Sequence, residues 1–541
     1  MKKIIISISA LFAFVAVVMG QNLDPTVEVS RVYEGKLVDV HKPAIEMAVP
    51  DTMYKFDLGF DYWVFDNPYK GSYEFKPYVM EMRPSTVQKR KNTFFLQAGA
   101  GYTLHPMLDL LWSPLKDGAF SMDVFATHRS YIGEYRALEQ IPAWEGYDLL
   151  SKAGVDFGYD WKKVDLDFGA SYYGIADKDY RRARGFNAVD AYASLESKSL
   201  KSNGLMYKAD LSYRFAEDSM EKMKEHDFDF DASLGSSLKN GSKVLVDFGL
   251  DMNVYTGALE STAGRFHIVP HYVFGKGRLG LDLGVRVSGI VATGGAFLNR
   301  GQVIYPDMRL DLALIPDAMK MYLRIGGGDR LQTYSSLIDK NHHLDLSYGF
   351  AGPGSLMDVT VERVSAILGF EGRIFSRFSY NLRGGYVNYK SAPLDAVGSA
   401  FCQYVPMLGY SPYQKAFAAI DWNMSFQGVR FDGSVAYNHV WGIENVDFIG
   451  LSALEGDVAF MYDWNGRINA GIDCNFATGR SSAAGFKVPG YADLGVCGEY
   501  ALNRKISFWL RGGNLLNMEI QRNLLFAEKG INFTAGICLN L

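Results

Sequence analysis

Long segments in which apolar and polar side chains alternate constrain the fold of this 541-residue chain more than any other feature. A β-strand turns successive side chains to opposite faces, so such a segment has one apolar face and one polar face. One segment places these apolar side chains at every second position: Val244, Val246, Phe248, Leu250, Met252 and Val254. The same pattern recurs in residues 164–173, 205–214, 227–234, 279–288 and 468–476. We therefore expect a chain built from long amphipathic strands.

The length of these segments favours a membrane-spanning sheet over a soluble one. Strands of globular proteins usually run about five or six residues, whereas tilted membrane-spanning strands need about nine to eleven. Lipid offers no hydrogen-bond partners, so every strand must pair and the sheet must close on itself. The pattern predicts an all-β fold, a transmembrane antiparallel β-barrel with its apolar face toward lipid and its polar face toward the lumen.

The connections between the segments alternate between short and long. Short turns are expected at residues 161–163, 240–241, 276–277, 427–428, 465–466 and 503–504. Longer polar stretches are expected as loops at residues 175–187, 216–225, 256–264, 327–358, 391–413, 441–454, 477–490 and 514–530. Bacterial outer-membrane barrels have short periplasmic turns and long extracellular loops. Counting with that parity predicts about 22 strands, within a range of roughly 18 to 22.

The chain divides into three predicted parts. Lys2 and Lys3 followed by the apolar residues 4–19, with small Val18 and Gly20, predict a secretory signal peptide at residues 1–20. Residues 21–92 form an N-terminal periplasmic or lumen-docking segment, and residues 93–541 form the barrel. Because the chain is exported and no later apolar run is long enough for a spanning helix, we expect a multi-pass protein of the bacterial outer membrane.

Composition excludes two classes of protein. Aromatic residues make up 14% of the chain and hydrophobic residues 48%, which excludes a disordered protein. The net charge of −5 and the lack of a basic block argue against nucleic-acid binding. The chain has four cysteines, Cys402, Cys474, Cys497 and Cys538. They allow disulfides, but we interpret them as small apolar side chains, because three of the four lie inside expected strands.

The C-terminal stretch carries a family resemblance. Residues 506–517 read Ile-Ser-Phe-Trp-Leu-Arg-Gly-Gly-Asn-Leu-Leu-Asn, and the last strand alternates Phe533, Ala535, Ile537, Leu539 and Leu541. This stretch resembles the closing strands of TonB-dependent receptors, in which an Asn-Leu-hydrophobic-Asn element often precedes the last loop. The terminal residue of that family is usually aromatic, and Leu541 departs from it. The resemblance implies an outer-membrane receptor barrel that admits a solute.

The N-terminal segment departs from the same family. Its receptors carry a TonB-contacting box and then a long folded plug, whereas only the 72 residues 21–92 precede the barrel here. Residues 26–30, Thr-Val-Glu-Val-Ser, only faintly resemble such a box, so contact with TonB is doubtful. Barrels of about 22 strands have a plugged lumen. We therefore expect these aromatic residues to dock in the lumen or at its periplasmic mouth, or alternatively to bind a periplasmic partner: Phe56, Phe60, Tyr62, Trp63 and Phe65.

The sequence shows no catalytic constellation, so we expect no enzyme and no cofactor or bound metal. His342 and His343 lie in a polar loop without other ligands at metal-binding spacing, and we interpret them as solvated. Arg181, Arg182 and Arg184 could meet an anionic substrate or lipid phosphates, and the favoured interpretation is again a solvated loop.

Charged residues of the alternating segments are expected to face the lumen: Asp165, Asp167, Lys208, Asp247, Asp251, Asp282 and Arg286. Such charges tune selectivity or pair across strands to hold a wide lumen in shape. Two functions follow. The first is solute transport across the outer membrane, and the second is a non-transporting barrel that scaffolds a surface or secretion complex. The expected contacts are outer-membrane lipid and a surface lipoprotein or periplasmic partner.

Overall fold

The computed structural model describes residues 93–541 except 103, 116–118, 139–140, 179, 181, 199–204, 239–240, 317, 375–376 and 401–402. The chain divides into two units, residues 1–66 and 67–541, and all described residues belong to the second. The predicted signal peptide (1–20) and N-terminal segment (21–92) lie outside the described residues and stay predictions.

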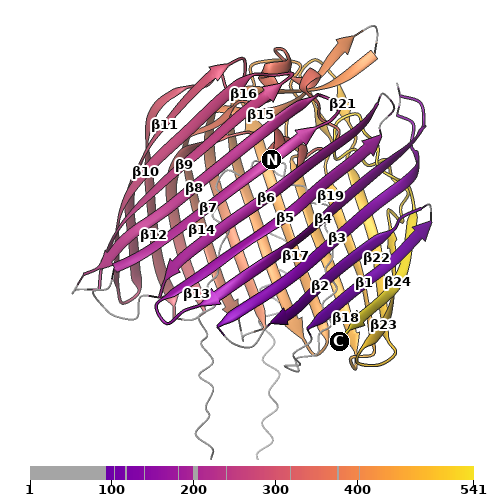
Figure 1. The fold of residues 1–541 in the computed structure, drawn as a ribbon, viewed down its shortest axis with the longest axis horizontal. Helices are drawn as coiled ribbons and strands as arrows, with labels where there is room; N and C mark the ends of the chain where they lie inside the picture. The colour runs from indigo at the N-terminus through magenta and orange to yellow at the C-terminus, as the bar shows by residue number, and fades with distance from the viewer. Residues whose placement is uncertain are drawn as a thin grey trace, which may run out of the picture. The chain divides into compact units, whose positions relative to one another are not determined.

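A single antiparallel sheet of 22 strands makes up the barrel (Figure 1). The first strand of the barrel pairs with the second on one side and with the last on the other, which closes the sheet into a ring. The predicted barrel and strand number are therefore confirmed. A two-stranded hairpin, β20 and β21, stands apart from this sheet.

The strands of the barrel are β1 (Phe94–Tyr102), β2 (Met107–Leu115), β3 (Phe120–Tyr135), β4 (Trp144–Asp160), β5 (Val164–Lys178), β6 (Ala183–Ser197), β7 (Leu205–Asp218), β8 (Met223–Ser237), β9 (Lys243–Gly257), β10 (Ser261–Lys276), β11 (Leu279–Gly294), β12 (Gly301–Ile315), β13 (Met319–Leu331), β14 (Val359–Ile374), β15 (Phe378–Ala400), β16 (Gln403–Phe426), β17 (Val429–Trp441), β18 (Leu454–Trp464), β19 (Ile468–Ala477), β22 (Tyr491–Ala501), β23 (Ile506–Gly513) and β24 (Asn532–Asn540). The hairpin strands are β20 (Arg480–Ser481) and β21 (Lys487–Val488).

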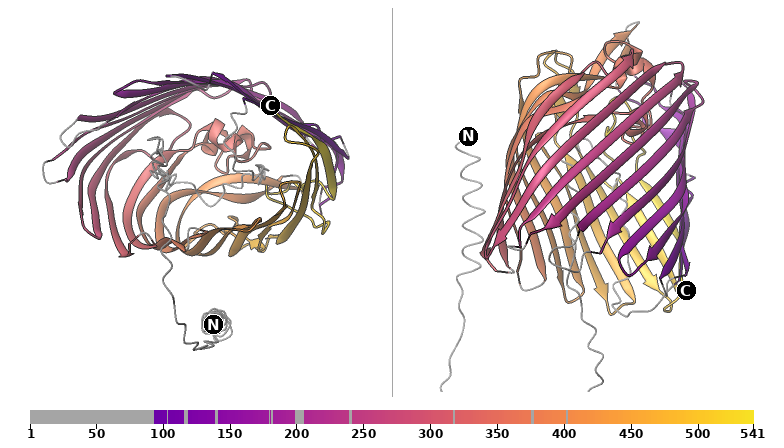
Figure 2. Two further views of the ribbon diagram at one scale, coloured as in Figure 1. Left: turned by 90° about the horizontal axis from the view of Figure 1, so that it is seen from below. Right: turned by 60° about the vertical axis from the view of Figure 1, so that its left-hand side comes forward.

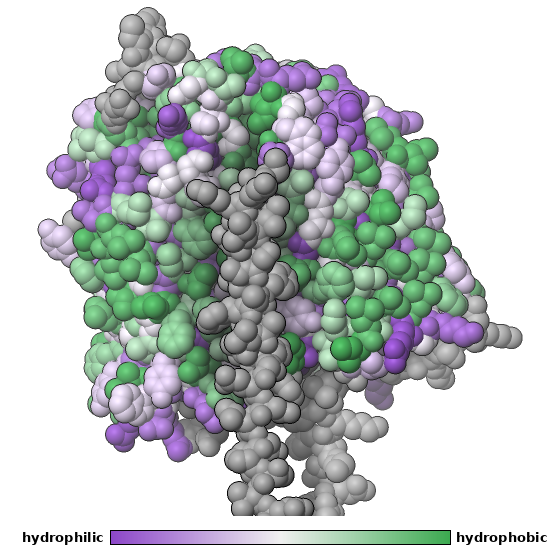
Figure 3. Space-filling model, turned by 180° about the vertical axis from the view of Figure 1, so that it is seen from behind, coloured by the Kyte–Doolittle hydropathy of each residue, from purple (hydrophilic) through white to green (hydrophobic). Residues whose placement is uncertain are grey.

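The alternation sorts side chains between the two faces of the wall. On β11, Val285 is 44% exposed and Val287 is 40% exposed, whereas Ser288, the residue after Val287, is fully buried. The outer wall presents hydrophobic side chains over much of its surface, with hydrophilic ones more common toward its two ends (Figure 3). A contiguous apolar surface of this extent in a monomer marks contact with lipid or protein, and a closed barrel offers it to lipid.

The connections have the predicted parity. At the end that holds the start of β1 and the end of β24, they are two to seven residues long. The opposite end holds the longest loops, at residues 332–358, 442–453, 478–490 and 514–531. Four expected loops were wrong in extent, because residues 175–187, 216–225, 256–264 and 391–413 lie mostly within strands. The backbone of these polar residues still pairs with a neighbouring strand. The change from apolar to polar residues therefore marks where the lipid-facing band ends, and the strand continues beyond it.

The loop between β13 and β14, residues 332–358, folds into the ring of strands (Figure 2). It contains α2 (Tyr334–Ile338), η1 (Leu346–Tyr348) and η2 (Pro353–Leu356). We call residues 332–358 the inward segment. Its apolar side chains pack against the inner wall in the largest buried cluster, which includes Leu337, Tyr348, Phe186, Tyr255 and Phe297. Among the described residues, no helix is long and apolar enough to cross a membrane.

Three of the cysteines carry free thiols, namely Cys474, Cys497 and Cys538. The Cys497 sulfur lies 3.5 Å from the Met461 sulfur in a small buried cluster, as expected for a cysteine that serves as a small apolar side chain. Cys402 lies outside the described residues.

Candidate functional site

The inward segment is closed at its neck by hydrogen bonds. The Gln332 N–H donates to the Asp358 carbonyl oxygen at 2.8 Å. The Asp358 carboxylate accepts from the backbone and side-chain nitrogens of Asn299 at 3.0 and 2.8 Å. The Thr333 hydroxyl accepts from the Ser336 N–H and caps α2. The neck therefore fixes where the segment leaves the wall and where it returns.

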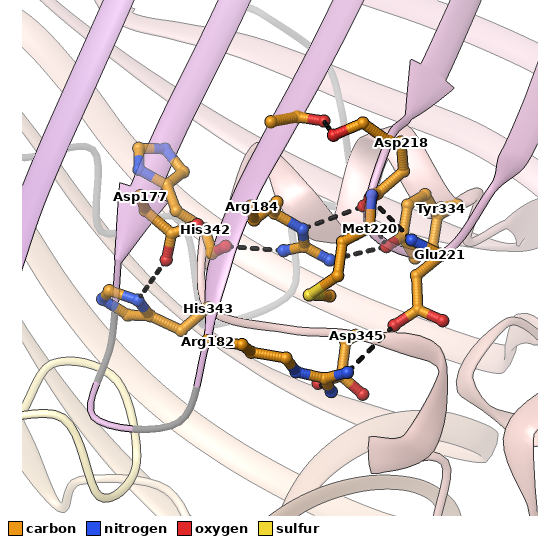
Figure 4. A network of polar contacts seen from close by, with 12 residues as sticks. Asp177, Arg182, Arg184, Asp218, Met220, Glu221, Tyr334, His342, His343 and Asp345 are labelled. Carbon is orange, nitrogen blue, oxygen red and sulfur yellow. Dashed lines mark hydrogen bonds and ion pairs between the residues drawn. The ribbon is translucent and has the colours of Figure 1, made fainter.

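A buried ion pair anchors the segment to the wall (Figure 4). Arg184 on β6 donates to the Asp218 carboxylate at 2.9 Å, to the Tyr334 hydroxyl at 2.6 Å and to the His342 carbonyl at 2.7 Å. The Tyr334 hydroxyl also donates to Asp218, at 2.7 Å. The side chains of Arg184 and Asp218 are 3% and 0% exposed. Burial raises the pKa of Tyr334 well above its ordinary value, so its hydroxyl stays protonated as a donor.

The start of α2 rests on a second buried carboxylate. Glu225 on β8 accepts from the Ser335 N–H at 2.9 Å, from the Ser335 hydroxyl at 2.7 Å and from the Tyr255 hydroxyl at 3.2 Å. The Tyr255 hydroxyl in turn accepts from the Tyr334 N–H. A carboxylate at this end of a helix satisfies N–H groups that have no partner within the helix. Loss of either partner would leave buried polar groups unpaired, which makes this contact specific for one position of the segment.

His342 and His343 face carboxylates on the wall. His343 Nδ1 lies 2.9 Å from Asp177, and His342 Nδ1 lies 3.6 Å from Asp148. Burial alone would lower the pKa of His342, but the hydrogen bond and charge of Asp148, with the charge of Asp177, raise it above its usual value. The raised pKa favours the protonated imidazole of His342, which the Asp148 carboxylate on β4 attracts.

Arg182 adds further ion pairs beside this buried anchor. It pairs with Asp345 at the start of η1, and its guanidinium lies 3.7 Å from Glu221. On β7 of the wall, Arg214 lies 2.5 Å from Asp190 of β6 and 3.1 Å from Asp339 of the inward segment, so it bridges the wall and the segment. The inward segment is therefore held by charges along its length as well as by apolar packing.

A second loop, residues 514–531 between β23 and β24, meets the inward segment inside the barrel. The ring of Phe526 stacks on His343 with centroids 4.1 Å apart. Arg522 pairs with Asp493 at 2.7 Å and with Glu528, and Asn514 donates to the Lys529 carbonyl at 3.2 Å. Burial lowers the pKa of Lys529, whose ammonium lies 5.7 Å from the Tyr131 ring.

A cavity of about 550 Å³ lies between these two loops and the wall. Its lining combines charged groups, such as Asp148, Arg511 and Lys529, with aromatic rings, such as Tyr131 and Phe526. Small-molecule sites commonly have about 300–1,000 Å³ and combine apolar walls with a few placed polar groups. This cavity is the candidate site for a solute.

Two interpretations of loop residues were wrong. The side chains of His342 and His343 are 23% and 14% exposed and paired, so they are not solvated. Arg184 is buried, Arg182 is partly exposed and paired, and Arg181 lies outside the described residues. In the sequence, Arg184, Asp218 and the two histidines lie in three separate expected loops, 175–187, 216–225 and 327–358. Only the folding of the segment into the lumen brings them together, so no local pattern could have revealed this anchor.

The register places the seven charged residues expected in the lumen on the wall face that also carries Arg184 and Glu225. Six of the seven form ion pairs with neighbouring side chains: Asp165 with Lys198, Lys208 with Asp210, Asp247 and Asp282 with His271, Asp251 with Arg265, and Arg286 with Asp307. Asp167 lies on the same face of β5. Their role in selectivity stays a prediction. Phe56, Phe60, Tyr62, Trp63 and Phe65 lie outside the described residues, and their docking stays a prediction too.

No protein-family model matches the sequence, and no curated protein matches it. Solved structures do match the fold. The siderophore receptor PirA from Acinetobacter baumannii aligns with a TM-score of 0.60 and 9% identity, over 83% of this chain and 80% of that chain. The copper transporter OprC aligns with a TM-score of 0.60 and 11% identity, over 85% and 82%. A mutant of the ferric enterobactin receptor from Pseudomonas aeruginosa aligns with a TM-score of 0.58 and 9% identity, over 83% and 80%.

These likenesses define the class of the fold. The chain is a 22-stranded β-barrel whose fold is similar to the folds of these two receptors and this transporter, as the resemblance of the barrel implied. With an apolar outer wall and a polar inner wall, such a barrel is a multi-pass protein of the bacterial outer membrane.

Proposed function

We propose that the chain transports a solute across the outer membrane through a passage that the inward segment and residues 514–531 narrow. The observation that carries this proposal is the cavity of about 550 Å³ between these two loops and the barrel wall. The structural neighbours, a siderophore receptor, a copper transporter and a ferric enterobactin receptor, support transport and are not enzymes.

The N-terminal segment supplies a second barrier in this proposal. Residues 56–82, with Phe56, Phe60, Tyr62, Trp63 and Phe65, dock in the lumen or at its periplasmic mouth. Their aromatic content supports this placement, because such a segment is unfavourable in water. The alternative, a linker that binds a periplasmic partner, leaves the lumen unchanged when the segment is removed.

Conductance in planar lipid bilayers tests both barriers. We expect low conductance from the native chain, a larger conductance from Arg184→Met, which frees the inward segment, and a further increase when residues 22–83 are also deleted. Unchanged conductance after the deletion would exclude docking in the lumen. Liposome swelling with sugars of increasing size then gives the width of the passage.

A non-transporting scaffold is the second candidate, and the buried packing between extracellular loops favours it. Ile141, Ile449, Val488, Leu524 and Leu525 come from four connections and form one apolar cluster. A lumen closed permanently in this way would leave every form in the bilayer experiment impermeable. That result would reject transport and support the scaffold.

A further inference from the structure

One sector of the inner wall concentrates negative charge. We call the following six residues of β5, β7, β8 and β9 the acidic belt: Asp165, Asp167, Asp210, Asp229, Asp231 and Asp251. The register joins them in adjacent rows across the wall. Asp165 is the second residue of β5, after the short turn 161–163, so the acidic belt reaches toward the short-turn end of the barrel.

Like charges stand directly opposite one another in the acidic belt. In the strand register, Asp210 lies opposite Asp231, and Asp229 lies opposite Asp251. Asp165 pairs with Asp160 on β4. Directly opposed like charges destabilise a sheet, so this arrangement works against the stability of the barrel.

Cations of the chain compensate the acidic belt only in part. Lys198 lies 2.6 Å from Asp165, Lys208 lies 3.1 Å from Asp210, and Arg265 pairs with Asp251. Among the described residues, the Asp167 side chain has no ion-pair or hydrogen-bond partner, and Asp229 accepts only from the Ser212 hydroxyl at 3.3 Å. His267 lies 4.0 Å from Asp231. The belt therefore keeps an excess of negative charge.

Part of the acidic belt is open to the lumen, whereas Asp251 is only 14% exposed. The side chain of Asp231 is 57% exposed, and those of Asp165 and Asp210 are each 42% exposed. The residues between them in the same rows are small, such as Gly158, Ser194 and Gly249, and do not cover them. On the opposite wall, by contrast, Asp421 pairs with Arg383, and Asp432 pairs with Arg430 at 2.7 Å.

We infer that the acidic belt makes the passage selective for cations, so that the transported solute carries positive charge. This inference rests on the proposed function and names its substrate class. Charges that line a pore raise the local concentration of ions of opposite sign and repel ions of the same sign. The belt acts as a charged wall along the passage and need not hold one ion in a fixed position.

The reversal potential across a bilayer in a KCl gradient tests the inference. The substitutions are made in the full chain and in its Arg184→Met form. We expect a several-fold preference for K⁺ over Cl⁻, which falls toward no preference in the variant Asp167→Asn, Asp210→Asn, Asp229→Asn and Asp231→Asn. Asparagine keeps the size of each side chain and an acceptor oxygen, so the wall should still fold; heat-modifiable migration on a gel checks this.

A control with the same change of charge uses exposed carboxylates outside the acidic belt: Glu145→Gln, Glu217→Gln, Glu260→Gln and Glu444→Gln. It should keep the preference for K⁺. A conducting native chain without cation preference, or an equal loss in both variants, would overturn the inference while leaving transport intact. A complete lack of conductance in all forms would reject the proposed function and the inference with it.

Discussion

Replacing Arg184 with methionine is expected to lower the free energy of unfolding by about 3–5 kcal/mol, because Asp218 then stays buried without its cation. Both side chains are almost fully buried, so solvent does not screen the pair. The substitution also removes the donors to Tyr334 and to the His342 carbonyl, which hold the inward segment. Unfolding in urea, followed in detergent micelles, gives the energy, and faster proteolysis within residues 339–347 reports release of the segment.

Arg182→Met is the matched control for this substitution. The Arg182 side chain is 36% exposed, and Asp345 keeps the Ser347 N–H at 2.7 Å as a donor. Although the Asp345 side chain is only 2% exposed, it keeps this donor, so we expect a smaller loss than for Arg184→Met. The double variant Arg184→Met, Asp218→Asn should recover stability, because the amide removes the unpaired charge and can still accept from the Met220 N–H. Equal losses for Arg184→Met and Arg182→Met would contradict the buried anchor.

Leu211→Arg is expected to destabilise the barrel by about 2–4 kcal/mol, the cost of a basic side chain on the lipid face near the bilayer midplane. Leu211 lies at the middle of β7, and its side chain is 42% exposed on the outer wall. Equilibrium unfolding from lipid vesicles measures the loss, and the yield of folding into the vesicles should fall with it.

The next residue supplies a control with the same new side chain. Ser212→Arg places the guanidinium on the inner wall opposite Asp229, where water and a carboxylate are available. We expect a change well below that of Leu211→Arg. If the two substitutions cost the same, the assignment of the faces of β7 is wrong.

The barrel could be predicted from the sequence because its cause is local. Lipid on one side and water on the other impose a period of two on every strand, and each segment records it independently, as residues 244–254 and 279–288 do. The tight turns carry their own signal, since Asn465, Gly466 and Gly428 adopt the positive φ angles that such turns require. Strand ends were harder to predict, because β15 and β16 continue as a hairpin beyond their barrel neighbours.

The candidate site could not be predicted, because its cause is not local. The inward segment binds β4 to β8 through residues that lie more than a hundred positions away in the sequence, such as Arg184 and Glu225 with Tyr334 and Ser335. A polar loop with two histidines has the same composition whether it extends into water or folds into a lumen. The lumen-facing charges were expected singly, but their concentration in the acidic belt depends on the register between strands, which alternation alone does not give.

A scan of lipid contact along β9 tests most directly the central claim that these strands form a membrane barrel. Single cysteines at positions 244–255, in a chain whose four native cysteines are serine, would carry an environment-sensitive fluorophore in vesicles that contain a quencher in their acyl chains. The account predicts strong quenching at the six even positions from Val244 to Val254 and weak quenching at the intervening odd positions. Uniform quenching, or none at any position, would contradict it.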